Sequence, residues 1–274
     1  MNIPARRSAL RIAASLLLCG FAAVVAAQTK PKVTNLGGTS PGNILFVGNS
    51  FFYFNNSMHR YLTGIARAAD AGNKGLYRSV SVTISGSGLD WHDVEAYLKP
   101  GLLGRYSFTE ENKVVFNPPG RGFDLVIMSD CSQCPIHPQL KSVFHEYVKK
   151  HSQTIVKSGA KPVLMMTWAY ADAPEMTAQL AEQYTLAGNA CDVLVAPAGL
   201  AFAKAIAKNP AINLYFTDKR HPSMAGSYLA AATIYATLSG KSPVGVSYTG
   251  ELDAKTAAFL QEVATETVKE YFGK

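Results

Sequence analysis

Three residues of this chain have the types and spacing of a serine nucleophile and its base. Ser50 lies in a Gly-Asn-Ser turn directly after a short apolar run, residues 44–47, and Asp218 and His221 stand three positions apart on a later segment. A serine hydroxyl attacks an acyl carbon only when a base accepts its proton, and a histidine oriented by a carboxylate is the usual base. The pattern therefore predicts acyl transfer at Ser50, with His221 as the base and Asp218 as the acid that orients it.

Acyl transfer also needs hydrogen-bond donors for the negative oxygen that develops on the substrate. The backbone N–H groups of Ser50 and Gly86 are candidates, and Gly88, in the same Ser-Gly-Ser-Gly turn, is a rival to Gly86. Three residues remain open as the side-chain donor: Asn49, Gln133 and Ser129.

The elements that must position these residues alternate between strand and helix. Apolar runs at 44–47, 80–84, 124–128, 162–167 and 192–196 predict strands, and the segments between and after them predict helices. This alternation is typical of one doubly wound α/β domain with a mainly parallel sheet, here residues 43–274. Right-handed crossovers then place the strand-end turns with Ser50, Gly86 and Gln133 on one rim, together with the loop of Asp218 and His221. Residues 102–121 interrupt the alternation and are interpreted as an insertion, with a small strand at 114–116.

The first 27 residues have the pattern of a secretory signal peptide. A basic start is followed by an apolar stretch, residues 12–25, and by small residues before Gln28, and the stretch is too short and wrongly flanked for a membrane span. We therefore expect a secreted or periplasmic protein. Residues 28–42 are rich in Thr, Pro, Gly and Ser and predict a disordered lead-in.

Charge and cysteines narrow the possible partners. The net charge is +7, and removal of residues 1–27 takes away three arginines and no acid, which leaves +4. No cluster of basic residues with interleaved aromatics is present, so we expect no nucleic-acid partner. Cys131 and Cys134 could close a small disulfide loop and leave Cys191 free, and a single C-x-x-C predicts no metal site. Nothing in the sequence indicates the oligomeric state.

Three segments resemble the SGNH (GDSL-like) hydrolase superfamily: G-N-S-F at 48–51, the glycine turn at 86, and D-x-x-H-P-S-x-x-G at 218–226. The first segment is similar to a bacterial branch with a G-N-S-F turn, and the similarity extends over residues 44–243. The resemblance implies a flavodoxin-like three-layer αβα sandwich with a five-stranded sheet, and an acyl hydrolase that uses neither metal nor cofactor.

By matching positions, the resemblance implies that Ser50 is the nucleophile, His221 the base, Asp218 its orienting acid and Gly86 an oxyanion donor. The asparagine that the superfamily carries after its third strand is absent, and Ser129 replaces the first glutamine of the branch. The third oxyanion donor therefore stays open.

The function expected from these observations is ester hydrolysis through an acyl-enzyme outside the cytoplasm. The resemblance favours O-acyl, acetyl-type esters of a carbohydrate or envelope polymer as substrates. Two alternatives remain: a non-catalytic carbohydrate-binding or scaffolding relative, and a flavodoxin-like protein that binds a phosphate or flavin at its first turn.

Overall fold

A computed structural model describes residues 29–37, 41–72, 77–116 and 122–274 of the chain. The predicted signal peptide lies outside these residues. The elements in chain order are β1 (Asn43–Gly48), α1 (Ser50–Tyr53), α2 (Met58–Ala69), β2 (Arg78–Thr83), η1 (Leu89–Trp91), α3 (Val94–Tyr97), β3 (Tyr106–Phe108), β4 (Val114–Phe116), β5 (Leu125–Met128), η2 (Cys134–Ile136), α4 (Lys141–Lys157), β6 (Lys161–Met165), α5 (Met176–Cys191), β7 (Leu194–Ala196), α6 (Ala198–Lys208), α7 (Met224–Ser239) and α8 (Ala254–Phe272).

The central sheet has five strands in the order β2-β1-β5-β6-β7, and every neighbouring pair is parallel. This strand order is that of a flavodoxin-like doubly wound sheet. The predicted fold class is confirmed, and the sheet is wholly rather than mainly parallel. Because β1 lies between β2 and β5, the turns that follow these three strands are neighbours at one rim of the sheet.

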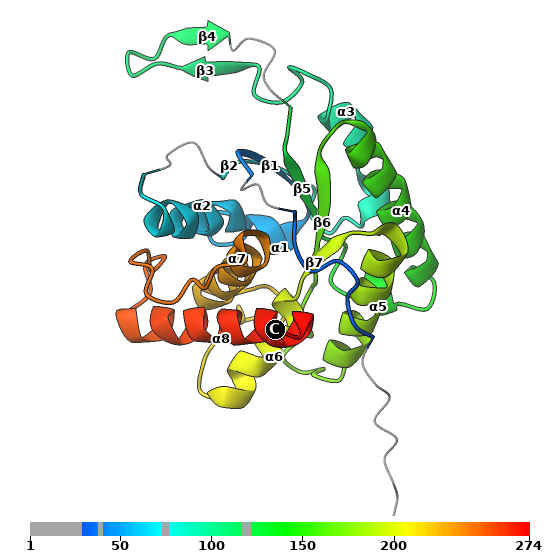
Figure 1. Cartoon of the computed structure of the whole chain (residues 1–274), viewed down its shortest axis with the longest axis vertical. Helices are drawn as coiled ribbons and strands as arrows, with labels where there is room; N and C mark the ends of the chain where they lie inside the picture. The colour runs from blue at the N-terminus through cyan, green and yellow to red at the C-terminus, as the bar shows by residue number, and fades with distance from the viewer. Residues whose placement is uncertain (1–28, 38–40, 73–76, 117–121) are drawn as a thin grey trace, which may run out of the picture.

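Helices cover both faces of the sheet because successive strand residues point to opposite sides. Ile44 and Phe46 of β1 pack into a core shared with α2, α6, α7 and α8. Leu45 and Val47 pack into the opposite core with α3, α4 and α5. All four side chains are fully buried, which explains why the strand has no polar alternation. The two helical layers are visible on either side of the strands (Figure 1).

Part of the lead-in docks on the domain instead of standing free. Thr29 donates its hydroxyl hydrogen to Glu182 of α5 at 2.7 Å, and Asn189 of the same helix accepts from the backbone N–H of Lys32 at 2.7 Å. Val33 and Leu36 pack against the core. The expectation of a disordered lead-in is therefore wrong for residues 29–37, because two apolar side chains and the α5 acceptors hold them.

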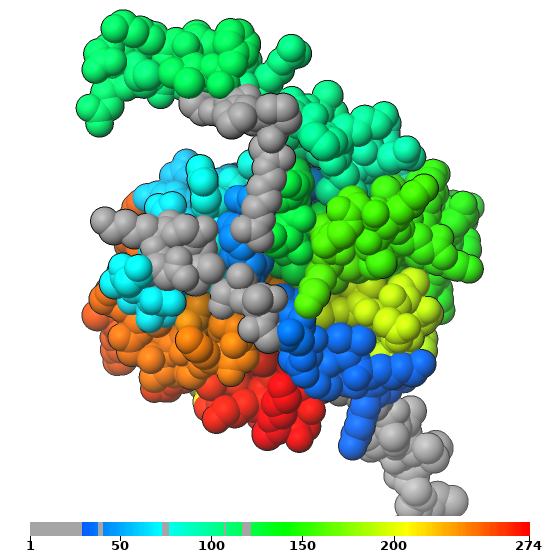
Figure 2. Space-filling view, turned by 45° about the horizontal axis from the view of Figure 1, so that its top comes forward, coloured from blue at the N-terminus to red at the C-terminus, as the bar shows by residue number. Residues whose placement is uncertain are grey.

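The region expected to be an insertion contains a two-stranded antiparallel hairpin, β3–β4, separate from the main sheet. The strand expected at 114–116 is β4. The hairpin projects from the body of the molecule (Figures 1 and 2). Within the described residues, no helix has the length and apolar character needed to cross a membrane.

Candidate active site

Ser50 is placed by the end of β1 and by a helix cap. Asn49 caps α1, its Oδ1 accepting from the backbone N–H of Phe51 at 3.1 Å, and Ser50 is the first residue of that four-residue helix. The sequence predicts only a turn at this point, because four residues are too few for a helical periodicity to show. Ser50 is largely buried, with 8% of its surface exposed.

Asp218 and His221 lie on a tight loop between residue 214 and α7. Tyr215 and Pro222 form a β-bridge, and the backbone N–H of Phe216 donates to the carbonyl of His221 at 2.8 Å. The bridge and this hydrogen bond close the loop on itself. Ser223 then caps α7 by accepting from the N–H of Gly226 at 3.2 Å, as expected of the residue before this helix.

The loop brings His221 against Ser50. Nε2 of His221 lies 2.8 Å from Oγ of Ser50, and Nδ1 of His221 hydrogen-bonds Oδ2 of Asp218. When Nδ1 donates to the carboxylate, Nε2 presents its lone pair to the Ser50 hydroxyl. The sequence analysis expected these three residues to converge, and the structure brings them into one hydrogen-bonded line. Such a line can remove the hydroxyl proton and return it to a leaving group.

Asp218 is held in its charged form. Partial burial acts to raise the pKa of this carboxyl, but hydrogen bonds from the His221 side chain and from the backbone N–H groups of Arg220 and His221 lower it to about 2. The two backbone bonds, both 2.9 Å, end on Oδ1. Oδ2 is therefore left for the imidazole. One carboxylate thus fixes the loop and orients the ring.

Aromatic rings enclose the imidazole of His221. Phe54 stacks on one face, with ring centroids 4.1 Å apart and planes 9° apart, and Phe51 makes a T-shaped contact with the imidazole, with ring centroids 5.7 Å apart. Phe51 in turn stacks on the buried Trp168 at 4.4 Å. The sequence analysis missed the contact of Phe54 with His221. The aromatic run that follows Ser50 is its only signal, and that run does not show which ring would reach the loop.

The segment after β6 anchors the loop that carries Asp218 and His221. Trp168 donates its indole N–H to the carbonyl of Arg220 at 3.0 Å, and the guanidinium of Arg220 lies 4.6 Å above the ring of Tyr170. The Tyr170 hydroxyl is 2.6 Å from Oγ of Ser132, which belongs to the turn after β5. The loop of His221 is thereby tied to the turn that carries Gln133.

Asn49 does not serve as an oxyanion donor. Its side-chain amide donates one hydrogen to the carbonyl of Ser87 at 2.9 Å and the other to the carbonyl of Asp130 at 3.0 Å. Both amide hydrogens are therefore used, and the residue is 3% exposed. Asn49 instead joins the three turns after β1, β2 and β5. The expectation that Asn49 donates to the oxyanion is therefore wrong, because both of its amide hydrogens are already bonded.

The two glycines of the second turn have different reasons to be glycine. Gly86 has a φ of +72°, a conformation that favours glycine, and a Cβ there would meet nothing within 4 Å. Gly88 is crowded, because a Cβ there would lie 2.5 Å from Oδ1 of Asp90 and 2.9 Å from Oδ1 of Asp130. Gly86 is exposed at the rim and Gly88 is buried. The backbone N–H of Gly86 is therefore the better placed of the two to face a substrate.

The side-chain donors predicted after β5 are placed differently. Ser129 is 1% exposed and lies beneath the rim, so its hydroxyl does not face the open surface. Gln133 is exposed, and its backbone carbonyl accepts from the backbone N–H of Ile136 at 3.0 Å. A disulfide joins Cys131 and Cys134 and holds the turn on both sides of Gln133. Gln133 therefore stays the side-chain candidate, and the cysteine pairing considered from the sequence is present.

Asp130 lies beneath this turn. Burial raises its pKa to about 6, against hydrogen bonds from the N–H groups of Cys131 at 2.7 Å and Leu89 at 3.2 Å. Its carboxylate and the sulfurs of Cys131 and Cys134 lie within 4.8 Å of one another. The disulfide removes both thiolates, which a metal site of this composition would need. The donor set therefore does not fit a metal ion while the disulfide is intact.

No protein-family model and no curated protein matches the chain. Several solved structures share its fold. A protein described as an SGNH hydrolase from Slackia heliotrinireducens aligns with a TM-score of 0.51 and 23% identity over 71% of this chain and 97% of its own. A DUF4886 family protein from Bacteroides uniformis aligns with a TM-score of 0.54 and 15% identity over 82% and 93%.

A third similar structure is a mutant of Axe2, an acetyl-xylooligosaccharide esterase from Geobacillus. It aligns with a TM-score of 0.51 and 16% identity over 73% of this chain and 94% of its own. At these identities the similarity concerns the fold, and the strand order and the helical layers agree with it. The chain has the three-layer αβα fold of the SGNH (GDSL-like) hydrolases, as its sequence motifs predicted.

Proposed function

We propose that this protein is a serine ester hydrolase that works through an acyl-enzyme at Ser50. The observation that carries the proposal is the 2.8 Å contact between Nε2 of His221 and Oγ of Ser50, with Asp218 on the opposite ring nitrogen. A phosphate- or flavin-binding turn would not require this line. The similar solved structures named as hydrolases and esterases add support for ester hydrolysis.

The proposed reaction has two stages, formation and hydrolysis of the acyl-enzyme. Oγ of Ser50 bonds to the ester carbonyl carbon while His221 takes the hydroxyl proton, and Asp218 stabilises the imidazolium. The negative oxygen faces the N–H groups of Ser50 and Gly86, with Gln133 as the side-chain donor. His221 protonates the departing alcohol, which leaves an ester on Ser50. A water molecule then attacks that ester, giving its proton to His221, and the acid leaves as Ser50 regains its hydrogen. Protons balance without a cofactor.

The nucleophile is tested with a fluorophosphonate probe and short p-nitrophenyl esters on the mature chain. We expect one adduct, on Ser50, with labelling lost in Ser50→Ala and weakened in His221→Ala. Ser85→Ala is the matched control, because Ser85 is an exposed serine on the neighbouring turn. An unlabelled protein that also fails to turn over the esters would contradict the proposal and favour a non-catalytic relative.

For the substrate, we infer an acetyl-type ester of a carbohydrate. Exposed aromatic rings suit the apolar faces of sugar rings, and the element after the second turn carries Trp91, 60% exposed, while the loop before Asp218 carries Phe216, 53% exposed. The similar acetyl-xylooligosaccharide esterase is consistent with this choice. We expect acetate release from acetylated xylooligosaccharides and faster turnover of p-nitrophenyl acetate than of the octanoate. A preference for the octanoate would contradict the inference.

Export is the remaining part of the proposal, and it rests on the sequence pattern of residues 1–27. Expression of the full chain in a bacterial host should yield a mature form whose first residue is Gln28. N-terminal sequencing of the periplasmic or culture fraction measures this directly, and an uncleaved protein in the cytoplasm would contradict it.

A further inference from the structure

A side chain that the proposed reaction does not use joins the segment of Ser50 to the loop of His221. Asn55 lies two residues after the end of α1. Its side-chain amide donates one hydrogen to the carbonyl of Pro222 at 2.9 Å and the other to Oγ of Ser227 at 2.8 Å. Pro222 follows His221 directly, Ser227 lies in the first turn of α7, and both residues are buried. Both amide hydrogens of Asn55 are therefore bonded on the side of the base.

These two hydrogen bonds link the nucleophile's segment to the base's loop. Apart from the catalytic contact itself, residues 50–57 and residues 213–227 share no other hydrogen bond within the part of the chain that the structure describes. Two phenylalanine rings of the first segment also contact the imidazole. Ring contacts fix a direction less sharply than two hydrogen bonds from one amide do. The amide of Asn55 is therefore the directional link between the two segments.

The backbone around Asn55 has an uncommon conformation. Asn55, Asn56 and Ser57 have φ values of +53°, +63° and +74°. No other run of three non-glycine residues with positive φ occurs in the described ranges. Asparagine is among the residues that tolerate this conformation, but a run of three still has an energetic cost. Such conformations persist only where surrounding contacts hold them, and they are concentrated at active sites.

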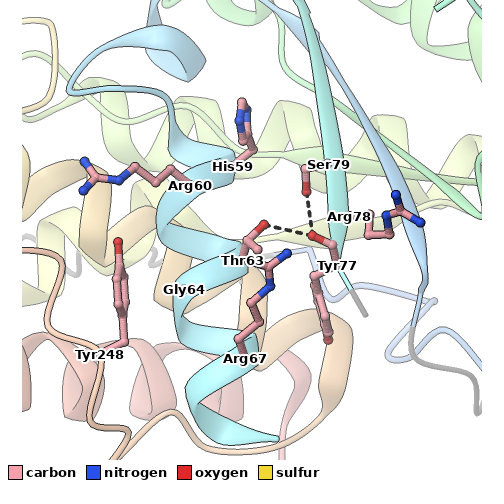
Figure 3. A pocket seen from close by; sticks show the side chains of 9 residues that line it. All are labelled: His59, Arg60, Thr63, Gly64, Arg67, Tyr77, Arg78, Ser79 and Tyr248. Atoms are coloured by element: carbon pink, nitrogen blue, oxygen red, sulfur yellow. Dashed lines mark hydrogen bonds between the residues drawn. The ribbon is translucent and has the colours of Figure 1, made fainter. Parts of the chain in front are cut away.

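The far end of this run is fixed to the sheet through α2. Nδ1 of His59, in the first turn of α2, lies 2.8 Å from Oγ of Ser57 and 2.6 Å from Oγ of Ser81 in β2. One helical turn later, the hydroxyl of Thr63 donates to the carbonyl of Tyr77 at 2.8 Å, next to the start of β2. Figure 3 shows His59 at the beginning of α2 and Thr63 beside that carbonyl. The helix is therefore fastened to β2, and the segment before it has a fixed support.

The separation between base and nucleophile matters for both stages of the proposed reaction. His221 takes the proton of Ser50 and later returns it, so Nε2 must stay within hydrogen-bond distance of Oγ. Displacing a catalytic group by about 1 Å can lower the rate by about 100-fold. Asp218 orients the imidazole, but it lies on the same loop as His221. It therefore cannot set the distance between that loop and Ser50.

We propose that Asn55 is a positioning residue, which holds the loop of His221 at reaction distance from Ser50. The inference rests on the proposed function and adds to it the residue that sets the separation of base and nucleophile. Asn55 acts through Pro222, the neighbour of His221, and not on the reacting atoms. The alternative is a role in stability alone, which would lower the amount of folded protein without changing the turnover of the folded molecules.

Asn55→Gly tests the proposal, because glycine adopts a positive φ without strain and so only the amide is lost. The matched control is Asn56→Gly: this neighbouring asparagine also has a positive φ, is exposed, and has no side-chain hydrogen bond to any described residue. We expect kcat for p-nitrophenyl acetate to fall by about 10- to 100-fold in Asn55→Gly, with KM within about twofold. The fluorophosphonate should label Ser50 more slowly by a similar factor. Asn56→Gly should stay within about twofold of the original protein in both measurements.

Hydrogen–deuterium exchange gives a second readout, which does not depend on turnover. The backbone N–H groups of residues 214–223 should exchange about 10-fold faster in Asn55→Gly than in Asn56→Gly, because a loop that has lost two hydrogen bonds opens more often. Thermal melting verifies that both variants are folded at the assay temperature.

Equal kinetics and equal exchange in the two variants would overturn the inference. A lower melting temperature in Asn55→Gly with an unchanged kcat would overturn it in favour of a role in stability alone. An original protein that neither turns over esters nor takes the label would overturn the proposed function, and this inference with it. Failure of the inference alone instead leaves an active original protein and two equally active variants, so the two failures are distinguishable.

Discussion

Asp218 connects the chemistry of the site to its local structure through a single carboxylate. Its pKa of about 2 means that it is ionised at every pH above about 4, so its charge does not change over the range in which a hydrolase is normally assayed. A carboxyl whose folded pKa is lowered stabilises the folded state above its unfolded pKa, and that stabilisation is lost as the pH falls toward 2.

Asp218→Asn should therefore lower kcat by about 10³- to 10⁴-fold at neutral pH, because the imidazole loses its oriented tautomer. Steady-state kinetics on p-nitrophenyl acetate at pH 7 measure this loss. A kcat within about 10-fold of that of the original protein would show that Asp218 is not the partner that orients His221.

Phe54 is a positioning residue at the same scale, because its ring stacks on the imidazole of His221. A ring face stabilises a neighbouring cation by about 1 kcal/mol, so Phe54→Leu should lower kcat by roughly 5- to 10-fold with little change in KM. Tyr53→Leu is the control, since this adjacent, exposed ring has no ring contact with His221. Steady-state kinetics on p-nitrophenyl acetate would contradict the role if both variants behaved alike.

Among the elements, the turns after β1, β2 and β5 are held together by Asn49 rather than by the strands alone. Replacement by alanine leaves two buried carbonyls and one helix N–H without partners, at about 1 kcal/mol or more each. Asn49→Ala should thus lower the free energy of unfolding by about 2–4 kcal/mol in urea denaturation. Asn35→Ala, which removes one exposed hydrogen bond to Gly37, should cost less than about 1 kcal/mol.

The disulfide in the turn after β5 closes a very short loop, with a sequence separation of three. Chain-entropy arguments for so short a loop give about 2 kcal/mol of stabilisation. Cys131→Ser, Cys134→Ser should lower the unfolding free energy by that amount. In unreduced, denatured protein that comprises residues 28–274, a thiol titration should find one free group, Cys191. A count of three would show that the disulfide does not form in solution.

The strands β1 and β5 were predictable because a buried parallel strand must be apolar throughout, as residues 44–47 and 125–128 are. Ser50, Asp218 and His221 were predictable because their chemistry requires those residue types. The role of Asn49 was not, since it depends on where the carbonyls of residues 87 and 130 come to lie after the sheet has formed. The difference between Gly86 and Gly88 is likewise a matter of backbone conformation and of crowding by Asp90 and Asp130.

At the scale of the whole molecule, the β3–β4 hairpin contributes little to the core. Its apolar side chains are exposed, from 48% for Val115 to 69% for Phe116, and Figure 2 shows it extending beyond the body of the domain. Replacing residues 105–116 by a short Gly-Ser linker should therefore leave the melting temperature within about 4 °C, equivalent to less than about 2 kcal/mol for a domain of this size. Turnover of small esters should also be kept. A collapse of either quantity, measured by calorimetry and ester assay, would show that the hairpin supports the fold.

The hydrogen bonds of Asn49 also constrain the order of events during refolding. They reach carbonyls 38 and 81 residues further along the chain, so they form only after long loops have closed, and such contacts arise late. A chain with native helices but an undocked β5 would hold Ser50 in an unfinished turn. Recovery of ester turnover would then lag behind the recovery of helical signal. Hydrolysis would act as a kinetic reporter of sheet completion, and premature activity in a half-folded chain would be avoided.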